Sequence, residues 1–213
     1  TLATAVAFAV GFASAAVAAD TPSPAAAPVA APAAASGHVP LLWKVSDKDN
    51  ALYLLGSFHL LRPSDLPLSA DIDAAMRDAK TTMFELDMET LTTPETAGKM
   101  QTAQRLEGDK TLTELLPVAT RDKLEALLKV GGGTLAQVDR VDPWALSLSF
   151  SIGAMAAMGF NGDSGPDRQL SRQARIEGKP RIALETLEDE LIALDRQPIA
   201  EQMQGLGKFI DDP

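Results

Sequence analysis

The sequence predicts an α/β fold with a mixed sheet, an N-terminal hairpin, mostly parallel core strands and a helical insertion. Apolar segments at 41–45 and 51–55 flank a cluster of turn formers at 46–50, which is typical of a hairpin. Two more short strands, at 81–87 and 179–184, alternate with helical patterns. Because strands that alternate with helices favour right-handed crossovers, these strands are expected to be parallel.

The second arm of the hairpin, 51–55, is apolar on both faces. A strand of this kind is typical of a sheet interior, where layers cover it from both sides. The sequence therefore predicts that 51–55 is covered on both faces.

Helices are predicted where apolar residues recur at helical spacing. They are expected at 69–80, 111–116, 119–130, 134–138, 142–160, 167–177 and 188–194. Asp142 is a good N-cap, and Pro143 suits the first position of the helix that follows. The run 144–160 carries no charged residue. It is short for a membrane span and contains serines and glycines, so we expect a buried or substrate-lining helix.

Composition limits the class of protein. The chain has 213 residues, 46% of them hydrophobic, which suffices for one core-bearing domain. Its formal net charge is −10 and it has no Lys/Arg-rich run, which argues against nucleic acid as a partner. With no cysteine, the fold uses neither disulfides nor a thiolate metal site.

The N-terminal region predicts export. Residues 1–19 carry no charge and end in an Ala-rich A-x-A pattern, typical of part of a signal peptide. Residues 20–40 are rich in Pro and Ala and predict a flexible linker, in which His38 is expected to be a spacer residue. The folded domain is expected at 41–213, in the periplasm. No stable membrane span is expected after signal cleavage, whereas an uncleaved signal would tether the protein to the membrane.

Three polar residues follow the predicted core strands. His59, Glu85 and Glu185 stand at their carboxyl ends, where ligands bind in open α/β sheets, so the three are expected to converge. Gly56 gives the chain the freedom to turn sharply before His59. We expect Gly56, Ser57, Asp87 and Glu185 to line the cleft, and most of the acidic run 188–190 to be a solvated helix N-terminus.

An imidazole with one or two carboxylates suits two kinds of chemistry. It can bind Zn, Mn, Fe or Co, or it can act as a general acid or base. The structural alternative for His59 is a hydrogen-bonded or exposed histidine, and for Glu85 a strand that has already reached solvent. No GxSxG motif and no phosphate-binding loop is present, and the glycines at 131–133 predict a linker between helices.

Four segments resemble the TraB family of TraB/PrgY, GumN-like and TIKI proteins. They are LLWKVSDKDNALYLLGSFHLL with its GxxH motif, TTMFELD, DSGPDRQLSRQARIEGKPRIALET and LIALDRQPIAEQMQGL. The resemblance implies an α/β fold related to the erythromycin-esterase and ChaN-like superfamily, with a metal-dependent hydrolase site. It makes Gly56 and His59 the first GxxH motif and Glu85 the acidic residue at the strand end.

The sequence departs from the family pattern at its carboxyl end. The family has a second GxxH motif about a hundred residues beyond the LET segment, and no such motif follows Glu185 here. We therefore expect that a carboxyl-terminal part is missing and that the 213 residues as given are inactive, because a metal held by two or three groups binds weakly.

The sequence thus predicts an exported, TraB/GumN-like, metal-dependent hydrolase that resembles a peptidase. His59 and Glu85 are the expected catalytic residues and ligands of a divalent metal, Mn, Co or Zn. The expected substrate is a peptide or another small amide or ester. The alternative is a non-catalytic periplasmic binding or accessory protein, which sequesters a peptide or aids polysaccharide export and uses the helix at 144–160 to line an apolar groove.

Overall fold

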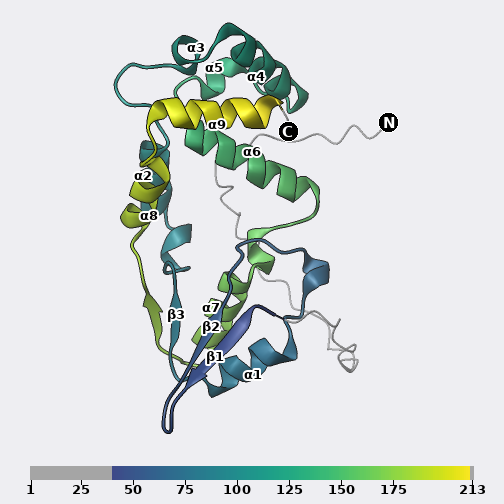
Figure 1. Ribbon diagram of the computed structural model, residues 1–213, viewed down its shortest axis with the longest axis vertical. Coiled ribbons are helices and arrows are strands. Elements are labelled where there is room, and N and C mark those ends of the chain that lie inside the picture. Colours follow the sequence, from purple (N-terminus) through teal and green to yellow (C-terminus); the bar gives the residue numbers. More distant parts are fainter. Residues whose placement is uncertain (1–39, 212–213) are drawn as a thin grey trace, which may run out of the picture.

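The computed structural model describes residues 40–211, and these residues form a mixed α/β protein (Figure 1). The predicted signal segment at 1–19 and residues 20–39 of the predicted linker, including His38, lie outside the described residues. So do the last two residues of the chain.

The strands are β1 (Leu42–Ser46), β2 (Ala51–Leu55), β3 (Thr82–Phe84) and β4 (Arg181–Ala183). The helices are α1 (Ala70–Asp78), α2 (Pro94–Ala103), α3 (Leu112–Leu115), α4 (Val118–Val130), α5 (Leu135–Val138), α6 (Pro143–Ala157), α7 (Pro166–Ile176), α8 (Leu187–Asp195) and α9 (Ile199–Asp211). Short 3-10 turns lie at Pro63–Asp65, Thr90–Thr92 and Gly162–Ser164.

The strands form two separate pairs in the described part of the chain. β1 and β2 form the predicted antiparallel hairpin, with Leu42 opposite Leu55. β3 and β4 form the predicted parallel pair, with Phe84 opposite Ala183. The prediction of one mixed sheet is therefore wrong for these residues. After β2 the chain turns away, and Leu61 pairs with Asn161 in an isolated antiparallel bridge.

The hairpin is covered on one face. Its turn is held by Asp47, whose Oδ1 accepts hydrogen bonds from the amides of Asp49 and Asn50 at 3.1 and 2.7 Å. Leu42 and Leu55 pack against the core beneath, whereas Trp43 and Leu54 on the other face are 56% and 50% exposed. The prediction that 51–55 is covered on both faces is wrong, because no layer of the described chain packs on that second side.

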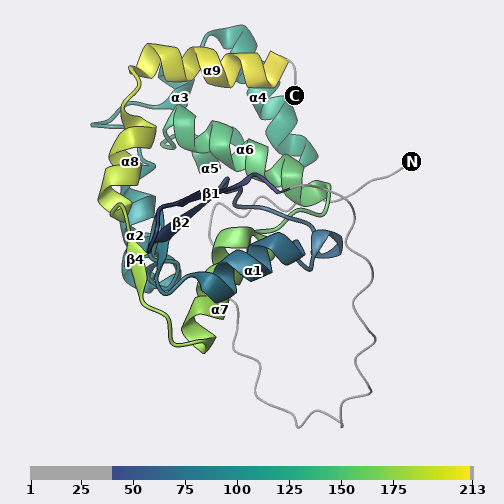
Figure 2. The ribbon, with the colours of Figure 1, turned by 60° about the horizontal axis from the view of Figure 1, so that its bottom comes forward.

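The larger core is helical. Helices α3, α4, α5, α6 and α9 gather at one end of the molecule, and both strand pairs lie at the other end with α1 and α7 (Figures 1 and 2). Fully buried leucines from these helices fill the centre, and Phe150 of α6 stacks on Phe209 of α9 with ring centroids 5.6 Å apart. The prediction of Asp142 as N-cap and Pro143 at the first position of α6 is confirmed. None of the described helices is long and apolar enough to span a membrane.

A smaller core supports the strands and the region around His59. Ile72 and Met76 of α1 pack with Leu170 and Ala174 of α7, and Phe84 of β3 lies against them. Helix α1 begins at the predicted Ser69 cap, whose hydroxyl oxygen accepts from the Ile72 amide at 3.4 Å. This core fixes α7 next to the hairpin.

Two helices, α2 and α9, were not predicted. Helix α9 carries Ile199, Met203, Leu206 and Ile210 at helical spacing, and the last two are buried. Gly205 and Gly207 interrupt this pattern and lower its helix propensity, which is overcome here by packing against α6 and α4.

Candidate functional site

His59 lies on the loop that leaves strand β2. The strand ends at Leu55, and the Gly56 amide then donates to the carbonyl oxygen of Leu41 at 2.7 Å. A Cβ on Gly56 would lie 3.0 Å from the Cβ of Leu41, which is tighter than ordinary packing. Glycine thus lets the two ends of the hairpin meet just before His59.

The His59 ring contacts the carboxylate of Asp167, which was not among the predicted site residues. Nδ1 of His59 lies 2.8 Å from Oδ2 of Asp167, and the Ser57 hydroxyl donates to Oδ1 of the same carboxylate at 2.6 Å. Asp167 is the second residue of helix α7. Its side chain is only 16% exposed, against 67% for His59. Asp167 therefore ties two residues of the His59 loop to α7.

Glu85 faces the other ring nitrogen of His59. It follows β3 directly, and its Oε2 lies 3.8 Å from Nε2 of His59. That distance is too long for a direct hydrogen bond. Since both side chains are at least half exposed, they point toward one another at an open edge of the molecule. The expected approach of His59 to Glu85 is present, although β2 and β3 belong to different strand pairs.

Glu185 lies beside Glu85 at the end of the neighbouring strand. Its backbone amide donates to the Glu85 carbonyl at 2.9 Å, which continues the parallel pairing of β3 and β4 by one residue. The two carboxylates thus leave adjacent strands at the same edge, as the sequence predicted.

Glu190 is the residue of the acidic run 188–190 whose pKa responds to the predicted site residues. Burial raises the pKa of the Glu190 carboxyl. The carboxylates of Glu85 and Glu185 raise this pKa further, whereas His59 lowers it. The charges of all three predicted site residues therefore act on the Glu190 carboxyl.

Asp87 lines a cleft beside this edge, and His59 is not among the residues that line it. The cleft has a volume of about 370 Å³, and Glu185 and Lys99 line it as well. The Asp87 carboxylate accepts from the Glu89 amide at 3.0 Å. A second cleft, of about 410 Å³, is formed by residues of α2, α4 and α5 and contains none of the predicted site residues.

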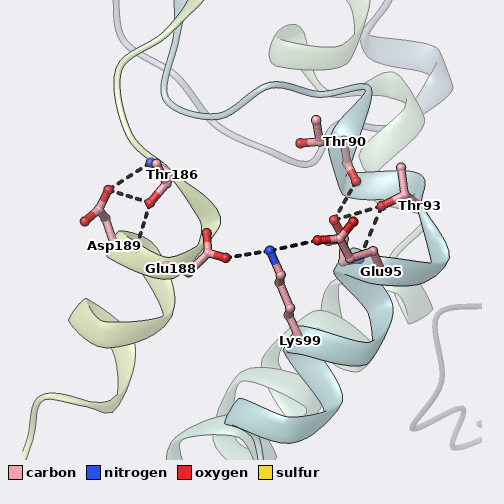
Figure 3. A network of polar contacts seen from close by, with 8 residues as sticks. Thr90, Thr93, Glu95, Lys99, Thr186, Glu188 and Asp189 are labelled. Carbon is pink, nitrogen blue, oxygen red and sulfur yellow. Dashed lines mark hydrogen bonds and ion pairs between the residues drawn. The ribbon is translucent and has the colours of Figure 1, made fainter.

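An ion-pair network between α2 and α8, shown in Figure 3, includes residues that line the Asp87 cleft. The ammonium of Lys99 lies 2.6 Å from Glu188 and 3.1 Å from Glu95. Thr186 and Asp189 cap the start of α8 with reciprocal hydrogen bonds. The acidic run at 188–190 thus has two roles. Glu188 and Asp189 serve α8 and its packing, whereas the pKa of Glu190 is raised in part by the carboxylates of Glu85 and Glu185.

Metal binding by His59 and Glu85 stays a prediction. Among residues 40–211, no three His, Cys, Asp or Glu side chains are arranged to hold a metal ion. His59 and Glu85 approach one another as a pair, and the nearest partner of His59, Asp167, occupies Nδ1 rather than the side facing Glu85.

The residues of the candidate site all lie in a region of the chain that matches the model of a known family. The model of the TraB/PrgY/gumN family matches residues 41–213. The chain belongs to the TraB/PrgY/gumN family. The match includes His59, Glu85, Asp167 and Glu185, so every contact described above lies within the TraB/PrgY/gumN region. No curated protein and no solved structure matches the chain.

Proposed function

We propose that this TraB/PrgY/gumN protein is a hydrolase that cleaves an amide or ester bond, most naturally in a peptide, at a centre formed by His59 and Glu85. One observation carries the proposal: Nε2 of His59 and Oε2 of Glu85 face one another at 3.8 Å, although the two residues come from separate strand pairs. A histidine and a carboxylate that converge at the ends of strands are typical of catalytic sites in α/β proteins.

The geometry supports a general acid/base reaction. The distance between the two side chains exceeds a hydrogen bond, and a water molecule beside the pair can donate one hydrogen bond to each of them. In the proposed step, Nε2 of His59 takes a proton from this water while the water oxygen bonds to the carbonyl carbon of the substrate. The C–N or C–O bond then breaks, and the proton passes from His59 to the leaving nitrogen or oxygen. General acid/base catalysis of this kind contributes about 10²–10⁴-fold to a rate.

The proposal includes the residues that would bind a divalent ion, Mn, Co or Zn. His59 and Glu85 are the residues that would bind it, and such an ion would lower the pKa of a bound water. Among the described residues, no group of three His, Cys, Asp or Glu side chains is arranged to hold the ion.

The proposal also places the protein in the periplasm, with a peptide or small amide or ester as its substrate. The uncharged, Ala-rich segment at 1–19 supports export, because it has the character of a signal peptide. The acidic composition supports a partner other than nucleic acid.

A non-catalytic peptide-binding protein is the second candidate, and one observation favours it. Leu148, Ile152 and Met155 of α6 are exposed and follow one another at helical spacing, so α6 presents an apolar face to solvent. A protein that only binds peptides would hold its ligand against such a face without cleaving it.

The test compares hydrolysis by the full-length protein and by variants of the two residues. Cleavage of a mixed peptide library is followed by mass spectrometry, with and without EDTA and with added Mn²⁺, Co²⁺ or Zn²⁺. We expect His59→Ala and Glu85→Gln to lower turnover by at least about 100-fold. His38→Ala and Glu125→Gln, a half-exposed position of α4, are matched controls and should keep full turnover.

The outcomes separate the candidates. Turnover that survives EDTA and depends on His59 supports the acid/base reaction, and turnover restored by one added metal supports an ion at the same pair. Turnover that His59→Ala leaves intact would refute the proposal. Peptide binding with no turnover in any condition would favour the second candidate.

A further inference from the structure

The Asp167 carboxylate, at the start of helix α7, makes its side-chain hydrogen bonds to the loop that carries His59. Both of its carboxylate oxygens are used by one loop, Oδ1 by the Ser57 hydroxyl at 2.6 Å and Oδ2 by Nδ1 of His59 at 2.8 Å. The carboxylate is largely buried, which is costly unless it is paired. Its position in the first turn of α7 stabilises its negative charge, because backbone amides point toward it there.

These contacts decide where the imidazole proton lies. An ionised carboxylate only accepts hydrogen bonds, so the Ser57 hydroxyl and Nδ1 of His59 must both donate to Asp167. In the neutral ring, Nδ1 then carries the only proton, and Nε2 presents a bare lone pair on the side of Glu85. Ser57 is therefore not placed as a nucleophile, since its proton goes to Asp167 and not to His59.

The backbone holds this arrangement in place. The amides of Leu61 and Asn161 each donate to the other residue's carbonyl, at 3.2 and 2.8 Å, just beyond His59 and just before α7. A Cβ on Gly165 would come within 2.1 Å of the His59 carbonyl oxygen, so only glycine permits this approach. The loop and the start of α7 thus form one packed unit, and the contact of Asp167 with His59 follows from it.

We propose that Asp167 is the positioning residue of His59: it fixes the ring orientation and holds the proton on Nδ1, so that Nε2 is free to act. Ser57 fixes the Asp167 carboxylate in turn. The catalytic meaning of this role rests on the hydrolase proposed above, but the tautomer of His59 can be measured without any activity. A carboxylate behind a histidine serves a general base and a metal ligand equally well, because either needs the lone pair on Nε2.

The experiment is long-range ¹H–¹⁵N NMR of the histidine side chains in the full-length protein, at a pH where the ¹⁵N shifts themselves show neutral rings. His38→Ala assigns the two histidines. We expect the Nδ1–H tautomer for His59 in the wild type and a shift toward the Nε2–H form, which water favours, in Asp167→Ala. Asp163→Ala is the control, because it removes a carboxylate four residues before Asp167. Asp163 pairs with Arg168 at 3.5 Å, so its loss should leave the tautomer of His59 unchanged.

Two results would overturn the proposal. One is an Nε2–H tautomer in the wild type, and the other is a tautomer that Asp167→Ala does not change. If Asp167→Ala fails to fold by circular dichroism, Ser57→Ala replaces it, and it should produce a smaller shift in the same direction.

In turnover assays Asp167→Ala should lose about 10–100-fold in kcat, with Asp163→Ala unchanged. A changed tautomer with no turnover in any variant would keep the positioning role and reject the hydrolase.

Discussion

The backbone of Gly165 lies so close to His59 that a Cβ on this glycine would be 2.1 Å from the His59 carbonyl oxygen. Gly165 caps helix α7 with an ordinary extended backbone, so the requirement for glycine comes from space and not from its dihedral angles. The candidate site therefore depends on a close contact between two backbone segments.

Gly165→Ala should destabilise the protein by about 3 kcal/mol, because overpacking against rigid backbone costs toward the upper end of its usual range. Chemical denaturation followed by circular dichroism measures the effect. Gly98→Ala is the matched control, since Gly98 lies inside α2 with no atom near its Cβ position. That change should stabilise by about 0.5–1 kcal/mol, as expected for Gly to Ala in a helix. Equal effects of the two changes would show that the contact at Gly165 is not tight.

Local signals predicted much of the fold. Turn formers around Asp47 located the hairpin, and the Asp142-Pro143 pair located the start of α6, because each structure is determined by a few neighbouring residues. The single sheet was wrong because no local pattern shows where the chain goes after Gly56. It turns toward Asn161 instead of continuing beside β3.

The candidate site was predictable only in part. His59, Glu85 and Glu185 stand at strand ends, and strand ends share an edge in α/β folds, so their approach could be expected. Asp167 could not be found in this way. Its partner His59 is 108 positions earlier in the chain, and an Asp in the first turn of a helix already has a sufficient local explanation.

Lys99→Met should weaken the packing of α2 against α8, because Lys99 is the cation between Glu95 and Glu188 in Figure 3. Exposed ion pairs are screened by salt, so the variant should have a lower Tm than the wild type at low salt and nearly the same Tm at about 1 M NaCl. Lys129→Met is the control, because Lys129 pairs with Glu125 inside a single helix. If the Tm of Lys99→Met were lower than that of the wild type by the same amount at both salt concentrations, the Lys99 side chain would act through packing alone.

Asp142 should make the stability of the protein depend on pH. Burial, followed by the Asp195 carboxylate, raises the pKa of the Asp142 carboxyl from 3.8 to about 6, and its Oδ1 is buried without a hydrogen-bond partner. The folded protein thus keeps a proton that the unfolded chain releases between these pH values. The contribution of Asp142 to stability is full below about pH 4 and is lost as the pH rises through about 6.

Asp142→Asn cannot ionise, so it should gain stability over the wild type as the pH rises. The difference in unfolding free energy should be near zero at about pH 4 and reach about 2–3 kcal/mol above about pH 7. Denaturation curves of both proteins across this range measure it. Asp122→Asn, at an exposed position of α4, should show no such trend. A constant difference between wild type and Asp142→Asn at all pH values would contradict the prediction.

Glu190 should respond to pH in the same direction, but through the candidate site. Burial raises the pKa of its carboxyl, and the neighbouring carboxylates of Glu85 and Glu185 add to this rise. Its contribution to stability is therefore present below its unfolded pKa, near 4.5, and is lost as the pH rises through the higher folded value. Glu190→Gln removes the repulsion and should stabilise the protein at neutral pH but not in acid.

A double-mutant cycle at neutral pH tests whether the repulsion comes mainly from Glu85. In that case the double variant Glu85→Gln/Glu190→Gln should gain less unfolding free energy than the sum of the two single changes. Strict additivity would mean that the two carboxylates do not interact.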